Sequence, residues 1–260
     1  MSLDAFADPA IADDLDRQGF SVVDNALDRD TAARLGTRLR EIARDLRERG
    51  ISTHTPIIDP NAHNVRIYDL PDHDPAFVDL LTAPEVTRAV DACLGPDWII
   101  SNFTANIARP GARAMKIHSD MALVFPGPWR ERWALNVIWC LDDIDEENGA
   151  TRYLPGSHLI SRLEDLPSQA AAATLPFEAR AGSAIVLDGR TWHCSGDNVS
   201  RDRDRALLFA YYARGFIRPQ ACWHETLRPE TIAALDERQR AMFGFGPLGN
   251  THGVPLIALS

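Results

Sequence analysis

Apolar residues between Trp98 and Tyr212 recur in short runs separated by glycine, proline and acidic turns. Short runs rich in β-branched and aromatic residues, bounded in this way, are typical of β-strands. The runs predict strands at 98–107, 134–141, 151–154, 176–180, 183–187 and 205–212, and one more within 114–123. Because these strands follow one another without helices between them, the pattern favours an antiparallel sandwich or barrel.

The first third of the chain has a different, helical spacing of apolar residues. Leu35, Leu39, Ile42 and Leu46 recur every three or four positions and form one apolar stripe. Helices are predicted at 9–18, from Asp28 or Asp30 to about 48, at 75–81, at 84–94 and at 229–242, with short strands at 20–23 and 65–68. We therefore predict a mainly β protein with helical flanks around a double-stranded β-helix core, a jelly roll of the cupin-like kind.

No linker divides the chain, so we predict a single domain over residues 1–260. It consists of a helical flank at about 1–95, a jelly-roll core at about 96–215 and a helical C-terminal extension at 216–260.

The composition narrows the class of partner. A net charge of −10 lacks the basic footprint of nucleic-acid-binding proteins. The first eight residues show no signal peptide, and the apolar runs are too short to span a bilayer. The four cysteines form no CxxC pair, which argues against a zinc ribbon. We expect a cytoplasmic protein that acts on a small molecule, without nucleic-acid or membrane partners, and the sequence leaves its oligomeric state open.

The candidate chemistry centres on His118-Ser119-Asp120. Side chains two positions apart on a strand point to the same face, so His118 and Asp120 would converge on one point. His193 follows a predicted strand and turn that can return it to the same rim, and two histidines with one carboxylate suit a divalent metal with open positions. The residues alone leave two alternatives, namely histidines packed in the core or a histidine–carboxylate pair in base catalysis.

Several blocks make the chain resemble the phytanoyl-CoA dioxygenase-like family of iron(II)/2-oxoglutarate oxygenases. The most specific block is Asn148-Gly149-Ala150-Thr151 followed by Pro155-Gly156-Ser157-His158. The others are His118-Ser119-Asp120, the stretch 193–200 with Arg205, the stretch 19–23 and the stretch 66–70. The resemblance covers most of residues 15–245.

This resemblance implies roles for particular residues. His118, Asp120 and His193 match the iron ligands, and Arg205 matches the arginine that pairs with the distal carboxylate of 2-oxoglutarate. Arg203 is the competitor, because the interval from His193 to Arg205 is about one residue longer than is usual in the family. Arg66 lies where the family often has a basic residue that reaches the cosubstrate or the substrate. Asn106 and Asn136 are polar residues within apolar strands, and they, like Ser195, either hydrogen-bond 2-oxoglutarate or make structural hydrogen bonds.

The resemblance implies an iron(II)- and 2-oxoglutarate-dependent dioxygenase that uses O₂ and releases succinate and CO₂. Because Asp120 is a carboxylate, we expect hydroxylation of an unactivated C–H bond of a small, anionic metabolite, with desaturation and ring formation as the alternative outcomes. Trp129, Arg130 and Trp133 form either a lid over this substrate or an ordinary packed loop. The alternatives are a metal-dependent cupin enzyme without 2-oxoglutarate, either an isomerase or a dioxygenase, and an inactive cupin-like binding protein.

Overall fold

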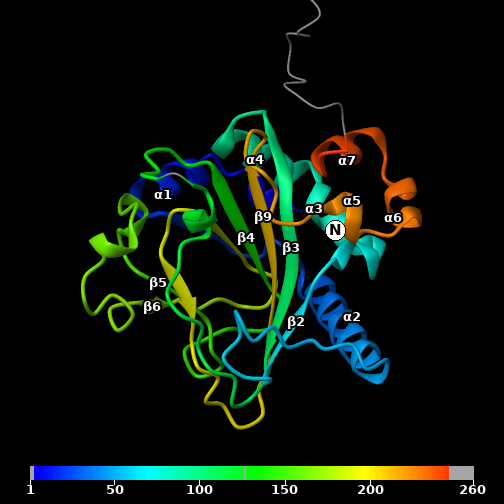
Figure 1. Ribbon diagram of the computed structural model, residues 1–260, viewed down its shortest axis with the longest axis horizontal. Helices are drawn as coiled ribbons and strands as arrows, with labels where there is room; N and C mark the ends of the chain where they lie inside the picture. Colours follow the sequence, from blue (N-terminus) through cyan, green and yellow to red (C-terminus); the bar gives the residue numbers. More distant parts are fainter. Residues whose placement is uncertain (1–2, 126, 246–260) are drawn as a thin grey trace, which may run out of the picture.

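A six-stranded antiparallel sheet in the order β1-β7-β4-β9-β3-β2 forms the centre of the protein (Figure 1). The computed structural model describes residues 3–125 and 127–245. A smaller sheet has the order β6-β5-β8. The strands are β1 (Phe20–Val23), β2 (Asn64–Ile67), β3 (Trp98–Ala108), β4 (Ala134–Cys140), β5 (Thr151–Tyr153), β6 (Leu175–Pro176), β7 (Ala184–Asp188), β8 (His193–Ser195) and β9 (Arg205–Arg214).

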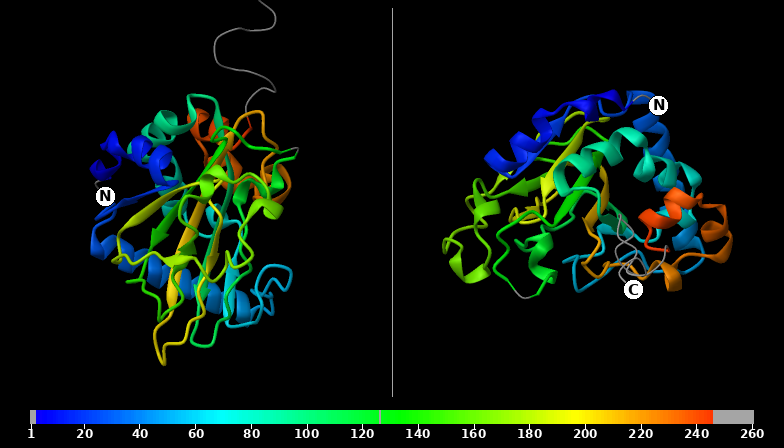
Figure 2. Two further views of the ribbon diagram at one scale, coloured as in Figure 1. Left: turned by 90° about the vertical axis from the view of Figure 1, so that its left-hand side faces the viewer. Right: turned by 90° about the horizontal axis from the view of Figure 1, so that it is seen from above.

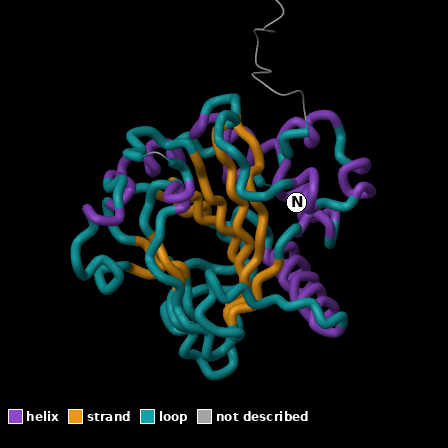
Figure 3. Tube along the Cα trace, viewed as in Figure 1, coloured by secondary structure: helices purple, strands orange, loops and turns teal. Residues whose placement is uncertain are grey.

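Seven α-helices surround the sheets in the described part of the chain (Figure 3). They are α1 (Ala10–Gln18), α2 (Arg29–Glu48), α3 (Pro75–Thr82), α4 (Pro84–Leu94), α5 (Trp223–Thr226), α6 (Pro229–Ala234) and α7 (Glu237–Met242). The long helix α2 begins where the Asp28 carboxylate accepts a hydrogen bond from the Thr31 amide, as an N-cap does. Helix α1 ends at Gly19, whose φ of +84° suits glycine.

The two faces of the large sheet are covered differently. On β4, Leu135, Val137 and Trp139 join the main hydrophobic core, which also contains the apolar faces of the helices. The alternate residue Ile138 belongs to a smaller cluster shared with the three-stranded sheet. Seen from above, α1 and α4 lie along one side of the large sheet (Figure 2). This antiparallel architecture with flanking helices confirms the predicted jelly-roll core, and the second face is where the candidate site lies.

Three expectations about the elements are corrected by the structure. The segment 114–123 forms no strand, because only His118 makes an isolated bridge and Asp120 begins a 3₁₀-helix, Asp120–Leu123. The strands expected at 20–23 and 65–68 in the N-terminal flank are part of the core, because β1 and β2 are the two edge strands of the large sheet. The helix expected at 229–242 is two helices, since a capping box at Asp236 starts α7 anew. Residues 246–260 of the expected C-terminal extension lie outside the described residues.

Within residues 3–125 and 127–245, no helix combines the length and the apolar character needed to cross a membrane.

Candidate metal centre

His118 and His193 lie opposite each other on neighbouring stretches of backbone. Each amide donates a hydrogen bond to the carbonyl of the other residue, at 2.9 Å from His118 and 2.8 Å from His193. This bridge adds the loop around His118 to the edge strand β8 of the small sheet. The centroids of the two imidazole rings are therefore only 4.3 Å apart.

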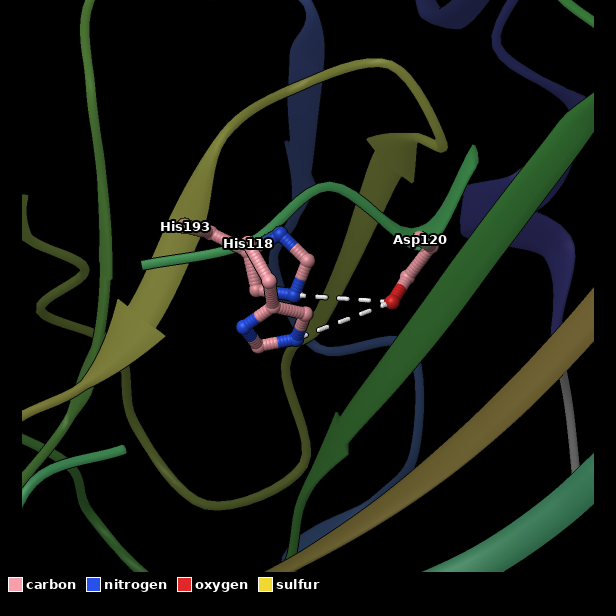
Figure 4. A group of neighbouring side chains, drawn as sticks. All are labelled: His118, Asp120 and His193. Carbon is pink, nitrogen blue, oxygen red and sulfur yellow. Dashed lines mark ion pairs between the residues drawn. The ribbon is translucent and has the colours of Figure 1, made fainter. Parts of the chain in front are cut away.

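Asp120 completes the group (Figure 4). Its Oδ1 lies 3.9 Å from Nε2 of His118 and 3.8 Å from Nε2 of His193. One ligand atom from each of the three side chains falls within 4.8 Å of the others, and this is the group of potential metal ligands found among the described residues. Two imidazoles and one carboxylate on one side of a point fit a divalent transition metal with positions left open.

Backbone hydrogen bonds engage Nδ1 of both rings and leave each Nε2 available on the side that faces Asp120. Nδ1 of His118 lies 2.9 Å from the carbonyl of Lys116, and Nδ1 of His193 lies 2.9 Å from the carbonyl of Thr191. Because a carbonyl only accepts, each Nδ1 carries a proton, and in the neutral form of either ring the lone pair is therefore on Nε2. Supporting partners of this kind fix the orientation of histidines that bind metals.

Burial keeps the first of these rings neutral. Desolvation is the largest cause that lowers the pKa of His118 to about 4, and the nearby His193 lowers it further. An ordinary histidine titrates near pH 6.5. At neutral pH the His118 imidazole is therefore uncharged, as a metal ligand must be.

The metal-free protein should lose stability as the pH falls from about 6.5 towards 4. The unfolded chain takes up a proton at His118 near pH 6.5, whereas the folded chain does so only near pH 4, so acid favours the unfolded state in that interval. Burial lowers the pKa of His73 and His158 as well, which adds to the slope. Urea unfolding at several pH values measures the effect. His118→Asn, which takes up no proton, should show a smaller slope, and equal slopes would contradict the interpretation.

Asn136 lies beside Asp120, on the second face of the large sheet. Its Nδ2 donates to Oδ2 of Asp120 at 2.9 Å, and its own Oδ1 is buried without a hydrogen-bond partner among the described residues. Asn136 was predicted to contact 2-oxoglutarate, and the contact found here is with the carboxylate of the candidate metal ligand.

Arg205 and Arg203, the two competing arginines, differ sharply in environment. Arg205 is 1% exposed; its Nε donates to the carbonyl of Gly149 and its Nη2 has no partner in the described part of the chain. Burial lowers the pKa of Arg205 to about 10, so it is still charged at neutral pH. The guanidinium of Arg203 instead lies at the surface and pairs with Asp145 and Glu147. The buried cation with an unused donor is therefore Arg205.

Asn106 and Ser195, two further residues predicted to contact the cosubstrate, differ in whether their side chains are already hydrogen-bonded. Asn106 on β3 is buried, pairs in register with Arg66 and Leu207, and leaves its Nδ2 without a partner within residues 3–125 and 127–245. Ser195 is occupied, because its Oγ accepts a hydrogen bond from the Met115 amide and so fastens the His118 segment to β8.

Arg66 has a partner that sequence reasoning missed. The guanidinium of Arg66 forms two hydrogen bonds, of 3.0 and 2.7 Å, with the carboxylate of Asp59. The Asp59 side chain is completely buried. It belongs to the loop between α2 and β2, where a polar, proline-containing sequence indicates only a surface loop. No signal in a single sequence distinguishes this aspartate from exposed ones.

The block Asn148–His158 supports the site as a scaffold. The Asn148 side chain accepts from the Asp145 amide and donates to the Asp143 carbonyl, which closes the acidic loop. Gly149 has a φ of +80°, and a Cβ there would lie 3.0 Å from the Gly196 carbonyl oxygen. This close approach presents the Gly149 carbonyl to Arg205.

Relatives of known class match most of the chain. The sequence profile described as "Phytanoyl-CoA dioxygenase (PhyH)" matches residues 15–206. "Dioxygenase af480" from Aspergillus fumigatus is 44% identical over 213 residues, which cover 82% of this chain and 69% of the relative. "Multifunctional dioxygenase prhA" from Penicillium brasilianum is 32% identical over 148 residues, 53% of this chain and 48% of the relative. The chain thus spans about half the length of this second relative.

Solved structures of similar fold agree with the architecture. AviO1 from Streptomyces viridochromogenes has a TM-score of 0.65 at 24% identity, covering 84% of this chain and 99% of that one. HygX from Streptomyces hygroscopicus, solved with nickel and 2-oxoglutarate, has a TM-score of 0.63 at 15% identity, covering 79% and 86%. The epimerase SnoN, dependent on α-ketoglutarate, has a TM-score of 0.64 at 20% identity, covering 85% and 89%. These structures support the fold, and the match over residues 15–206 with the 44% identical relative shows that the chain belongs to the phytanoyl-CoA dioxygenase family.

Proposed function

We propose that the protein is a non-haem iron(II)- and 2-oxoglutarate-dependent dioxygenase that hydroxylates an unactivated C–H bond of a small metabolite. Its family consists of oxygenases that use these cofactors together with O₂. The observation that carries the proposal is the convergence of His118, Asp120 and His193 within 4.8 Å, with Nδ1 of each ring hydrogen-bonded to a backbone carbonyl.

The residues present fit both cofactors. His118, Asp120 and His193 would hold iron(II), and the buried Arg205 would pair with the distal carboxylate of 2-oxoglutarate. The unpartnered Nη2 of Arg205 and Nδ2 of Asn106 are buried donors that the described residues leave unused. A guanidinium paired with a carboxylate fixes orientation as well as affinity. When bound, iron and 2-oxoglutarate supply the oxidising power for the C–H bond, with succinate and CO₂ as co-products.

Arg66 contributes differently from Arg205. Because Asp59 already neutralises its guanidinium, Arg66 adds little net charge to the cosubstrate pocket. We assign to this pair the shaping of the pocket wall beside Asn106, with Arg66 offering hydrogen bonds rather than a free charge. Ser195 holds the His118 segment in place through the Met115 amide.

The substrate we propose is an apolar molecule that carries an anionic group. Lys116, the only lysine of the chain, lies exposed two residues before His118 and forms no ion pair with any described residue. Apolar residues extend from the metal site to the surface. Met121, Trp192 and Tyr211 form a buried cluster with Trp129, and Trp133 contacts the exposed Phe216. Trp129 is thus a packed residue of the loop, and we assign to Trp133 a contact with the substrate.

A test of this function measures succinate. Purified protein with iron(II), 2-oxoglutarate and O₂ is screened against apolar carboxylic acids and their methyl esters. The expected result is substrate-dependent succinate release with a product heavier by one oxygen atom, from the acid in preference to its ester. Product formation that does not require 2-oxoglutarate would replace the proposal with a 2-oxoglutarate-independent metal enzyme. Succinate release with a product that has gained no oxygen atom would leave the cofactor assignment standing and would contradict hydroxylation.

A further inference from the structure

Three hydrogen bonds hold Asp120 and the residues on either side of it, although this segment lies outside any strand. The Met121 amide and the Ser119 hydroxyl both donate to the carbonyl of Gly189, at 2.9 and 2.8 Å. The hydroxyl of Tyr211, on β9, donates to the carbonyl of Asp120 at 3.3 Å. These contacts fix the main chain, but none of them determines how the carboxylate is turned.

The Asp120 carboxylate itself is contacted by Asn136. It lies on the central strand β4, in register with Tyr211, and its side chain is 6% exposed. Its Nδ2 donates to Oδ2 of Asp120, which leaves Oδ1 as the oxygen that faces both histidines. A donor from a rigid central strand thus distinguishes two otherwise equivalent oxygens.

We propose that Asn136 is a positioning residue that keeps Asp120 a one-oxygen ligand of the metal. A carboxylate with both oxygens free can chelate a metal through both and occupy one more coordination position. Because the amide engages Oδ2, that position stays open for cosubstrate and O₂. The inference rests on the proposed function, and it assigns to Asn136 a role on the metal ligand rather than on 2-oxoglutarate.

The burial of Asn136 argues against a merely structural role. Its Oδ1 is buried without a partner in the described part of the chain, and such an atom weakens a fold. An apolar residue of the same size would pack at this position without that loss. The amide therefore contributes little to stability, and among the described residues the carboxylate of Asp120 is the one partner that its side chain has.

The test compares nickel binding and stability in matched variants. Asn136→Leu keeps the number and branching of the side-chain heavy atoms and removes the donor, and Asn136→Asp keeps the shape but places a carboxylate against Asp120. Calorimetric titration with Ni(II) should show binding about 10–100-fold weaker in both variants, the usual effect of losing a supporting partner of a metal ligand. The unfolding midpoint of metal-free Asn136→Leu should be unchanged or higher. Asn102→Leu, on β3 and hydrogen-bonded to Gln220, is the control and should bind like the parent.

Each possible result bears either on the role of Asn136 or on the proposed function. Nickel affinity within about twofold of the parent in both variants would overturn the inference and leave the proposed function standing. A lower unfolding midpoint in Asn136→Leu with unchanged affinity would make Asn136 a structural residue. Should Asn136→Leu fail to fold, Asn136→Asp decides by the same affinity criterion. If the folded parent itself binds no nickel, the proposed function fails, and this inference fails with it.

Discussion

Replacing Arg205 with alanine should weaken 2-oxoglutarate binding to the Ni(II)-loaded protein by at least about 100-fold. Arg205 is buried and has an unused donor at Nη2, so a carboxylate that reaches it is paired away from water. Removing one partner of a buried ion pair costs about 3–5 kcal/mol, and about 1.4 kcal/mol corresponds to a factor of ten. Calorimetric titration with 2-oxoglutarate gives the affinity directly.

Arg203→Ala is the matched control, because it removes the same side chain two residues away on the same segment. The ion pairs of Arg203 with Asp145 and Glu147 lie at the surface, where such pairs contribute about 0–1 kcal/mol. We expect 2-oxoglutarate affinity within about threefold of the parent. If Arg203→Ala loses the affinity and Arg205→Ala keeps it, the assignment of the cosubstrate arginine is wrong.

Asp120→Ala should lower metal affinity by more than about 100-fold and abolish turnover. The loss should exceed the 10–100-fold typical of removing a supporting partner, since this variant removes a proposed ligand atom and the only negative charge of the group. Titration of the metal-free protein with Ni(II) measures the first effect, and succinate release measures the second.

The control for Asp120→Ala is Asp202→Ala, which removes a carboxylate from an exposed position in the charged loop before β9. It should leave both metal affinity and turnover unchanged. If the Asp120→Ala protein still binds Ni(II) like the parent, or still forms product, Asp120 is not a metal ligand.

Strand periodicity was sufficient to predict the face on which Arg205 lies. The residue shares its parity with Leu207 and Tyr211, and both belong to clusters on the second face of the large sheet. The helices α2, α3 and α4 were also predictable, because caps, prolines and apolar spacing are local signals.

Long-range contacts explain what the sequence could not predict. Asp120 turns away from strand geometry because Ser119 and Met121 bind the carbonyl of Gly189, some 70 residues downstream. The burial of Asp59 depends on Arg66, and the role of Asn136 depends on the register between β4 and β9. A single sequence contains no record of such pairings, although it shows polar residues within apolar strands.

The most direct test of the central claim is an anaerobic titration of the metal-free protein with iron(II) and 2-oxoglutarate, followed by visible absorption. The account predicts a weak, broad charge-transfer band that appears only when both are present and is lost in Asp120→Ala. A folded parent protein that shows no such band would contradict the assignment of His118, Asp120 and His193 as an iron site for 2-oxoglutarate chemistry.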